Sequence, residues 1–250
     1  MTSGIPISNH NYVRTATNRN LKEIFLGRCW EFQELVNPDP FVDRGKDCDA
    51  LWGHFTSAFA YKEPCATTDA DYEPFATAAV HALSEHENLF WESVYPFVTE
   101  FSSNGKRYTT IADTLLGYMV DQLQWCGQLE DPGINYDNCP TDDDCEKVNG
   151  QTPNYSYWLK TSDYFSAETI GRSSVLLNGS HQLPFDSQSI FATRELVNLR
   201  PELNVSHLHI IILHDLGGVI VYYHPDVSFA VSEICLKSAV LDHESNRSSG

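Results

Sequence analysis

Cysteines are the feature that most restricts what this chain of 250 residues can fold into. Seven of them are spread over the sequence, at Cys29, Cys48, Cys65, Cys126, Cys139, Cys145 and Cys235. Because they form no C-x-x-C pair and no histidine stands at zinc-finger spacing, a structural zinc site is disfavoured. Disulfide bonds are the better interpretation, and they form in an oxidising compartment. The odd number leaves one thiol for an intermolecular bond or for an unpaired buried site.

Glycosylation signals agree with this compartment. Four Asn-x-Ser sequons, none with proline in the middle, begin at Asn154, Asn178, Asn204 and Asn246. Apolar runs such as 210–213 fall well short of the roughly 20 residues that a membrane helix needs. We therefore expect a chain that is soluble as given, and either secreted or held on the extracellular face of a membrane by an anchor outside this chain.

The charge of the chain limits its partners. The sequence has 34 acidic and 16 basic side chains, a net charge of −18 at pH 7. This balance argues against binding to nucleic acid, which needs a face of positive charge to neutralise phosphates. Hydrophobic residues make up 42% of the chain, which is ordinary for a globular protein. A small molecule or another protein is the expected partner, and a homodimer stays open.

Helical periodicity dominates the first half. After Asp47 the spacing of apolar residues predicts a helix that stops at Lys62-Glu63-Pro64. An aromatic-rich helix is predicted over 88–100, and the clearest helix over 110–125, where Thr110 resembles the start of a capping box and Gly127 follows the end. Residues 1–20 lack periodicity and are predicted to form a loose arm or an exposed first turn.

The second half has a different pattern. Residues 130–150 are acidic and rich in turn residues, which predicts a surface loop stapled by two cysteines. After Trp158, short β-branched or leucine-rich runs at 174–177, 208–213 and 219–223 are bounded by Asn, Gly and Asp. Such runs are typical of buried strands in a parallel sheet. The chain is therefore predicted to combine a helical part with an α/β part.

Familiar catalytic motifs are missing. The chain has no G-x-S-x-G, no G-x-x-x-x-G-K and no G-x-G-x-x-G after a strand. His207 and His209 alternate on one strand, with His214 and His224 nearby, and two such histidines could bind a metal. A third ligand and a carboxylate to hold water are not evident, so a metal-dependent hydrolase is only an alternative.

Aromatic and acidic residues have ordinary explanations when they are taken alone. Trp91, Trp125 and Trp158 would be core residues, because indole rings bury large areas. Glu195 stands directly after Arg194 and would be a surface carboxylate paired with that arginine.

Several segments in a fixed order resemble the ADP-ribosyl cyclase family. The most specific is D-T-L-L-G-Y-M at 113–119, which runs into W-C-G at 125–127. Further similar stretches lie at 25–29, 48–59, 64–65, 71–72, 135–140, 157–158, 177–180 and 191–199. The resemblance covers roughly residues 24–215.

This resemblance implies an enzyme that cleaves the nicotinamide–ribose bond of NAD. The ADP-ribosyl group then closes on itself or passes to water. NAD is the substrate, and no cofactor or metal is implied. Glu195 matches the catalytic glutamate of the family. The implied substrate contacts are Trp91 and Trp158 for the nicotinamide and ribose, Asp121 for the nicotinamide amide, and Ser162 and Phe191 near the ribose and diphosphate.

Three departures from the family pattern concern the pocket. Ala112 stands where the family usually has a glutamate, and Ile190 stands where hydrolytic members have threonine and strongly cyclising members phenylalanine. Both changes make the pocket less polar, which predicts that cyclic ADP-ribose is a substantial share of the product. Glu92-Ser93 replaces the family's serine-arginine, so another cation or a cluster of backbone N–H groups must hold the diphosphate.

The resemblance also implies disulfide pairs. They are Cys29 with Cys48, Cys65 with Cys145, and Cys126 with Cys139, with Cys235 left over. A further family bridge is absent, because Glu85 and Ile170 occupy the positions of its two cysteines.

Together these observations predict an α/β protein with two parts. Residues 1–84 with 111–155 form a mainly helical part. Residues 85–110 with 156–250 form a part with a small parallel sheet flanked by helices, and an active-site cleft lies between the two. The first alternative is a catalytically silent receptor or adhesion ectodomain of the same fold.

Overall fold

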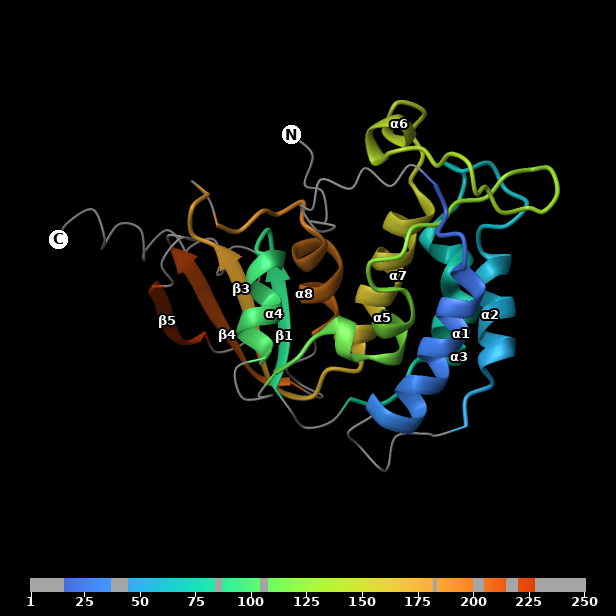
Figure 1. Ribbon diagram of the computed structural model, residues 1–250. Helices are drawn as coiled ribbons and strands as arrows, with labels where there is room; N and C mark the ends of the chain where they lie inside the picture. Colours follow the sequence, from blue (N-terminus) through green and yellow to red (C-terminus); the bar gives the residue numbers. More distant parts are fainter. Residues whose placement is uncertain are drawn as a thin grey trace. The chain divides into compact units, whose positions relative to one another are not determined.

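The computed structural model describes residues 16–36, 45–83, 87–103, 108–181, 184–199, 205–214 and 220–227 (Figure 1). By their contacts these residues divide into two compact units. The helical unit consists of the described residues within His10–Ala82 and Ile111–Tyr164, and the sheet unit of those within Leu83–Thr110 and Phe165–Gly250. The predicted α/β class is confirmed.

The helical unit is built around an aromatic core. Its helices are α1 (Leu21–Glu31), α2 (Cys48–Ser57), α3 (Glu73–Ala79), α5 (Leu115–Val120), α6 (Asp142–Glu146) and most of α7 (Pro153–Ala167), with the short segments η1 (Phe32–Val36), η2 (Asp69–Tyr72) and η3 (Ile111–Asp113). The Phe55 ring centre lies 5.0 Å from those of both Phe25 and Trp125 and 5.9 Å from that of Tyr157. These fully buried rings hold the helices together through apolar area and edge contacts.

Helix α2 confirms the helix predicted after Asp47. The Asp47 carboxylate accepts hydrogen bonds from the N–H groups of Asp49 and Ala50, at 3.0 and 3.1 Å, and so caps the helix. Leu51 and Phe55 face the core. The helix ends at Ser57, five residues before the predicted stop.

The helix predicted over 110–125 is wrong in its extent. The structure has the single 3-10 turn η3 and then α5, which begins after Thr114 and ends at Val120. The Thr114 hydroxyl donates to the Ile111 carbonyl at 2.6 Å and accepts from the Gly117 N–H at 3.2 Å, so this side chain closes one turn and starts the next helix. Gln122 has a φ of 59°, which turns the chain out of the helix.

The aromatic-rich helix predicted over 88–100 is wrong in its first half and confirmed from Tyr95 onward. Residues of β1 (Glu87–Glu92) form a strand, and α4 (Tyr95–Ser103) begins only after Ser93, whose φ is 57°. Side chains of β1 alternate between the two faces of the sheet. Leu89 packs in one apolar cluster with Val94 and Val98. The centre of the Phe90 ring lies 5.1 Å from the centre of the Phe165 ring. Both faces are therefore covered, and an apolar run of this kind has no period that distinguishes a strand from a helix.

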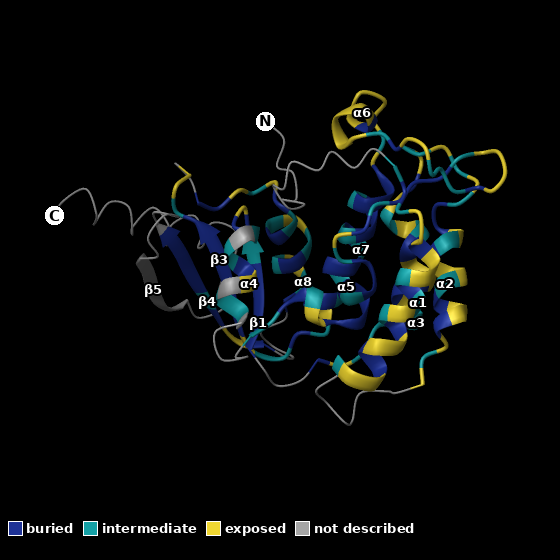
Figure 2. Ribbon diagram, viewed as in Figure 1, coloured by how far each residue is buried: buried dark blue, intermediate teal, exposed yellow. Residues whose placement is uncertain are grey.

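The sheet has five strands in the order β2-β1-β3-β4-β5. Its other strands are β2 (Tyr108–Thr109), β3 (Gly171–Asn178), β4 (Val205–His214) and β5 (Ile220–Val227). The pairs β1–β2, β1–β3 and β3–β4 are parallel. The β3–β4 pair confirms the parallel strands predicted over 174–177 and 208–213. The β4–β5 pair is antiparallel, so the prediction of a parallel strand over 219–223 is wrong in direction. Figure 2 shows β3 and β4 as mostly buried, in contrast to the mostly exposed α6.

The three implied disulfide pairs are confirmed. Bonds join Cys29 to Cys48, Cys65 to Cys145, and Cys126 to Cys139. Cys235 and the position of Glu85 lie outside the described residues, whereas Ile170 is described and lies next to β3.

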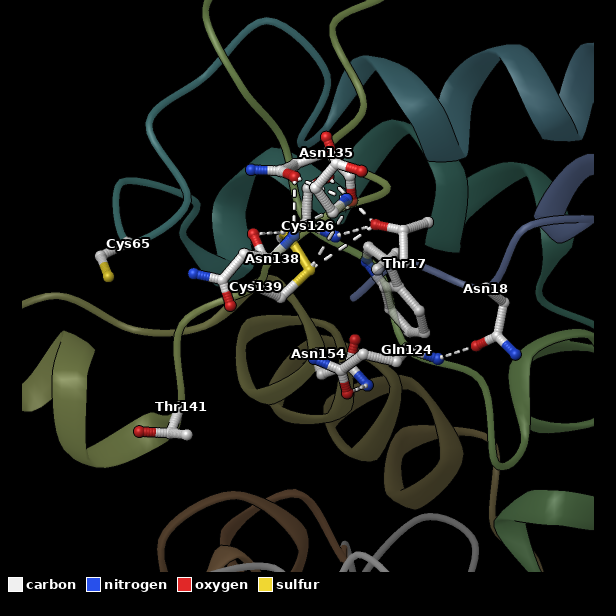
Figure 3. The surroundings of a disulfide bond; sticks show 12 residues. Thr17, Asn18, Cys65, Gln124, Cys126, Asn135, Asn138, Cys139, Thr141 and Asn154 are labelled. Carbon is white, nitrogen blue, oxygen red and sulfur yellow. Dashed lines mark hydrogen bonds between the residues drawn. A yellow bond between two sulfur atoms is a disulfide. The ribbon is translucent and has the colours of Figure 1, made fainter. Parts of the chain in front are cut away.

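Residues 16–20 are the described part of the segment predicted as a loose arm or an exposed first turn. Arg19 and Asn20 form an exposed turn before α1, whereas a loose arm is wrong for Thr17 and Asn18. Thr17 is buried, and its hydroxyl accepts a hydrogen bond from the Cys126 N–H at 3.0 Å (Figure 3). The Asn18 side chain accepts from the Gln124 N–H at 2.7 Å, and the Gln124 carbonyl accepts from the Asn18 N–H at 3.0 Å. The chain is therefore fixed beside the Cys126–Cys139 disulfide from Thr17 onward.

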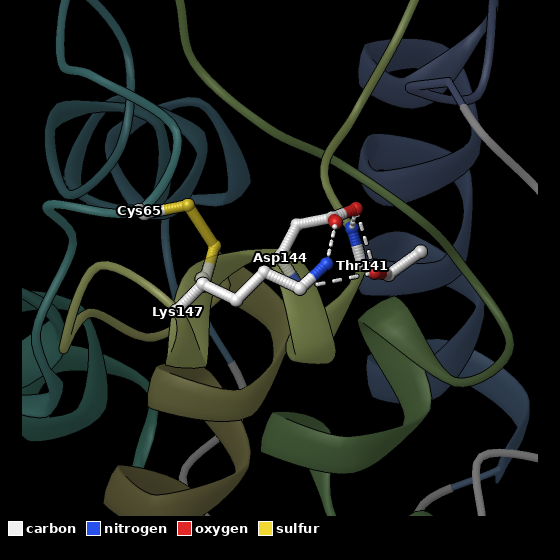
Figure 4. A network of polar contacts seen from close by, with 5 residues as sticks. Cys65, Thr141, Asp144 and Lys147 are labelled. Carbon is white, nitrogen blue, oxygen red and sulfur yellow. Dashed lines mark hydrogen bonds and ion pairs between the residues drawn. A yellow bond between two sulfur atoms is a disulfide. The ribbon is translucent and has the colours of Figure 1, made fainter.

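The acidic segment contains the helix α6, which the prediction of a loop missed. Thr141 and Asp144 form a reciprocal capping box (Figure 4). The Asp144 carboxylate also accepts a hydrogen bond from the Lys147 ammonium group at 2.9 Å. The disulfide bond of Cys65 lies beside these contacts. These hydrogen bonds hold the pKa of Asp144 at about 2, well below its usual value. Asp142 accepts from Thr152 at 2.5 Å. The acidic run thus serves local structure, and Cys139 and Cys145 staple the segment as predicted.

Burial corrects the interpretation of two sequons. Asn154 is 2% exposed, and its side-chain nitrogen donates to the Leu123 carbonyl at 2.9 Å. Asn178 is 6% exposed, and its nitrogen donates to the Ser93 carbonyl at 3.1 Å. Both side chains are therefore buried in the folded chain, whereas a glycan needs an asparagine exposed to solvent. Asn204 and Asn246 lie outside the described residues.

Candidate active site

The sheet unit collects four of the predicted site residues near the carboxyl end of β1. Trp91 lies in β1, half-buried, with its ring centre 6.3 Å from that of Tyr95. Ile190, Phe191 and Glu195 lie on η4 (Phe191–Glu195) and its N-cap, ahead of the short α8 (Leu196–Asn198). Carboxyl ends of parallel strands are where open α/β sheets commonly bind ligands.

Glu195 is not the surface carboxylate that its neighbours in the sequence suggest. Its residue is only 7% exposed, in a turn of π-helix. Carboxylates are rarely buried unless they have a partner or a function, and π-helical turns occur often at functional sites. Phe191, at the start of the same turn, is 1% exposed, and its ring centre lies 5.9 Å from that of Phe90. Strand β1 therefore supports the turn that carries Glu195.

Glu92, the residue after Trp91, points to the same turn. It is 6% exposed, and its carboxylate accepts hydrogen bonds from the Asp186 N–H at 2.5 Å and from the Ser189 hydroxyl at 2.8 Å. Burial raises the pKa of Glu92 to about 7, although both hydrogen bonds act in the opposite direction. Sequence reasoning singled out Glu92 as a departure from the family, but no periodicity in the sequence indicates its burial.

The helical unit carries the other four predicted site residues. Trp158 and Ser162 are four residues apart on α7 and so lie on one face of that helix. Trp158 is half-buried, whereas Trp125 is fully buried, as expected for a core residue. Ala112 lies half-buried in η3, and Asp121 caps the carboxyl end of α5.

Asp121 has a partner that sequence reasoning did not identify. The Arg28 guanidinium donates to the Asp121 carbonyl at 2.7 Å. Burial raises the pKa of the Asp121 carboxyl, and the charge of Arg28 partly offsets this effect. Arg28 belongs to the stretch 25–29, one of the segments that resemble the family. That membership is the one signal in the sequence that could have pointed to Arg28.

The histidines on β4 have separate neighbours. His209 Nδ1 lies 3.3 Å from a carboxylate oxygen of Glu87, and His207 Nδ1 lies 3.1 Å from the Ser206 hydroxyl. Within the described residues, no three potential metal ligands come together. The side chains of His214 and His224 lie outside the described part.

Comparison with known proteins identifies the family. The model of the family described as ADP-ribosyl cyclase matches residues 18–236. The chain belongs to the ADP-ribosyl cyclase family. It is 35% identical to the human ADP-ribosyl cyclase/cyclic ADP-ribose hydrolase 2 over 203 residues, which are 81% of this chain and 61% of the human protein. The match thus spans about three fifths of that relative's length.

Solved structures of cyclases share the fold. A structure of Aplysia cyclase complexed with substrate NGD and product cGDPR is 32% identical, with a TM-score of 0.73 over 82% of this chain and 80% of that one. A structure of porcine CD38 with a covalent intermediate, ribo-F-ribose-5'-phosphate, is 28% identical, with a TM-score of 0.72 over 82% and 85%.

The segments that identify this cyclase-family chain have structural reasons. A Cβ on Gly117 would lie 2.1 Å from the Ile111 carbonyl oxygen, and one on Gly127 would lie 2.0 Å from the Phe59 carbonyl oxygen. Only glycine fits either position. The Trp125 ring N–H donates to the buried Tyr72 hydroxyl at 2.8 Å. The D-T-L-L-G-Y and W-C-G segments therefore hold the helical unit together, and Asp121 follows from the end of the first.

The predicted site residues thus fall into two groups of four. Trp91, Ile190, Phe191 and Glu195 belong to the sheet unit, and Ala112, Asp121, Trp158 and Ser162 to the helical unit. The cleft predicted for them stays a prediction.

Proposed function

We propose that this chain cleaves the nicotinamide–ribose bond of NAD and passes the ADP-ribosyl group to adenine N1 of the same molecule or to water. The observation that carries this proposal is Glu195, a buried carboxylate on a π-helical turn at the place where the family resemblance predicts the catalytic glutamate. The family membership and the names of the relatives support it. Because the human relative is longer than the matched region, its activity is transferred here as a proposal.

Nicotinamide is a good leaving group for such a reaction. It is a cationic ring in NAD and departs neutral, so it needs no general acid, unlike the alcohol that leaves in glycoside hydrolysis. One carboxylate therefore suffices. As the C–N bond breaks, its electron pair goes to the nicotinamide nitrogen and the ribose becomes an oxocarbenium ion. Glu195 stabilises that positive charge, and its partial removal from water makes the interaction stronger.

The half-buried tryptophans are suited to hold the cationic ring. An indole face attracts a cation by about 0.5–2 kcal/mol, and a half-buried ring keeps part of its surface for a ligand. We propose this role for Trp91 and Trp158. Asp121, whose backbone is fixed by Arg28, would contact the nicotinamide amide, and Ser162 and Phe191 would contact the ribose and diphosphate.

Product choice depends on which nucleophile reaches the anomeric carbon. Closure by adenine N1 forms a new N–C bond within the molecule, whereas attack by water forms an O–C bond and releases a proton. Ala112 and Ile190 present only hydrocarbon surface, which holds water poorly. We propose that both lower the share of hydrolysis and that cyclic ADP-ribose is a substantial product.

We further propose an extracellular or lumenal location. The three disulfides support it, because such bonds persist in oxidising compartments. No helix among the described residues is long and apolar enough to span a membrane.

Incubation with NAD tests the activity directly. Chromatography should show nicotinamide with cyclic and linear ADP-ribose from the unmodified chain. Glu195→Gln should lower turnover by at least about 100-fold, equivalent to about 2.7 kcal/mol of barrier, while NAD still binds. Glu130→Gln is the matched control, because Glu130 is an exposed glutamate in a loop. The absence of all three products from the unmodified chain would favour a silent receptor, and near-normal turnover of Glu195→Gln would move the site elsewhere.

A further inference from the structure

A chain of hydrogen bonds joins the end of β1 to the start of η4. The Glu92 carboxylate accepts from the Ser189 hydroxyl at 2.8 Å, and the oxygen of that hydroxyl accepts from the Ala192 N–H at 3.1 Å. The Ser189 carbonyl in turn accepts from the Thr193 hydroxyl at 2.7 Å and from the Thr193 N–H at 2.9 Å. Ser189 therefore starts the helical turn, and Glu92 orients its hydroxyl.

The other carboxylate oxygen of Glu92 holds the segment before Ser189. It accepts from the Asp186 N–H at 2.5 Å. The Asp186 carbonyl accepts from the Ser189 N–H at 3.0 Å, and the Asp186 carboxylate accepts from the Gln188 N–H at 2.9 Å. Residues 186–189 thus form a closed turn, and the two ends of this turn are bound to one carboxylate.

Burial of the Glu92 carboxylate away from water costs free energy. A buried carboxylate is normally paired with a cation, but among the described residues the charge that acts on Glu92 is the Asp186 carboxylate, which has the same sign. A polar group kept in such surroundings commonly has a role in placing other groups. Glu92 follows Trp91 in the chain, and the turn that it holds leads directly into Phe191 and Glu195.

We propose that Glu92 is a positioning residue for the catalytic turn. By binding both ends of the turn 186–189, its carboxylate fixes the start of η4 to the end of β1, so that Phe191 and Glu195 keep a set position relative to Trp91. This role rests on the proposed function, in which Glu195 faces the oxocarbenium ion. Misplacement of a catalytic group by about 1 Å can cost 100-fold in rate.

Four variants test this role by steady-state kinetics with NAD and by hydrogen exchange of the peptides over 186–199. Glu92→Ala removes both acceptors, and Ser189→Ala removes only the hydroxyl between Glu92 and η4. Glu92→Gln keeps the shape, because its carbonyl can accept from Asp186 and its amide can donate to the Ser189 oxygen. Gln188→Ala is the matched control, since that side chain is exposed on the same turn.

We expect Glu92→Ala to lower kcat at least about tenfold with KM changed less than about threefold, and to speed exchange over 186–199. Ser189→Ala should act in the same direction. Glu92→Gln and the control should stay within about threefold of the unmodified chain. If Glu92→Ala does not fold, Ser189→Ala decides.

Two outcomes would overturn the proposal. One is that Glu92→Ala and Ser189→Ala both keep the kcat and the hydrogen-exchange rates of the unmodified chain. The other is a Glu92→Gln variant as impaired as Glu92→Ala, because the charge and not the placement would then matter. Failure of the proposed function can be told apart from failure of this proposal. If the unmodified chain leaves NAD intact, the proposed function fails, but hydrogen exchange over 186–199 can still be faster in Glu92→Ala.

Discussion

Replacing Glu92 by glutamine should make the chain more stable at neutral and alkaline pH. The folded state raises the pKa of this carboxyl from its ordinary 4.5 to about 7 because the side chain is removed from water. Folding therefore favours the protonated form. The stability that depends on Glu92 is fully present below pH 4.5 and is lost as the pH rises through 7. Glutamine can bond the same two partners without ever ionising, because its carbonyl accepts from the Asp186 N–H and its amide donates to the Ser189 oxygen.

The size of the effect follows from the two pKa values. With 4.5 in the unfolded chain and about 7 in the folded chain, ionisation of Glu92 costs about 1 kcal/mol at pH 5 and about 3 kcal/mol at pH 8. Glu92→Gln should therefore unfold at a higher temperature than the unmodified chain by roughly 6–12 °C at pH 8, and by much less at pH 5.

Calorimetric unfolding of both proteins at several values between pH 4.5 and pH 8 provides the measurement. Other titrating groups are common to the two proteins, so their contributions cancel in the difference. A difference in melting temperature that does not change with pH would refute the reasoning. So would an unmodified chain that is the more stable of the two at pH 8, since Glu92 would then be stabilised as an anion.

Three other changes have expected outcomes. Replacing Cys65 and Cys145 together by serine removes the disulfide that closes a segment of 80 residues. The free energy of unfolding in denaturant titrations should fall by about 4 kcal/mol. A loss under about 1 kcal/mol would contradict the estimate from loop length. Burial lowers the pKa of His81, whose Nε2 accepts from the Leu115 N–H at 3.0 Å, so its contribution to stability is present above pH 6.5 and lost below it. His81→Gln should therefore flatten the fall in melting temperature between pH 7 and 5, and equal slopes would be inconsistent with this role. Ala112→Glu should raise linear relative to cyclic ADP-ribose in product chromatography, where about 1.4 kcal/mol changes the ratio tenfold; an unchanged ratio would show that pocket polarity does not select the product.

Local signals in the sequence were sufficient for several elements. Asp47 marks the start of α2 because aspartate is a preferred N-cap residue and its side chain bonds N–H groups only two and three residues away. The runs at 174–177 and 208–213 could be assigned as strands because β-branched residues bounded by turn residues fit a buried sheet. The disulfide pairs came from the family resemblance, since the spacing of seven cysteines is compatible with many connectivities.

The candidate site was predictable only in part. The identities of Glu195, Trp91 and Trp158 came from motif order, and the sequence alone favoured a surface carboxylate and two core rings. Arg28 and Glu92 took their places as partners only in the folded chain, because each bonds a group that is distant in sequence: Asp121 lies 93 residues from Arg28, and Ser189 lies 97 residues from Glu92.

The sequence by itself determined the fold class, the family and the residues able to bond at short range. Tertiary structure decided that 87–92 is a strand, that β5 runs antiparallel to β4, and that Asn154 and Glu92 are buried. The physical reason is common to all of these. An apolar or aromatic run gains the same free energy from burial in a helix or a strand, and a polar side chain is hidden only when distant segments cover it. Those contacts exist only once the chain has folded.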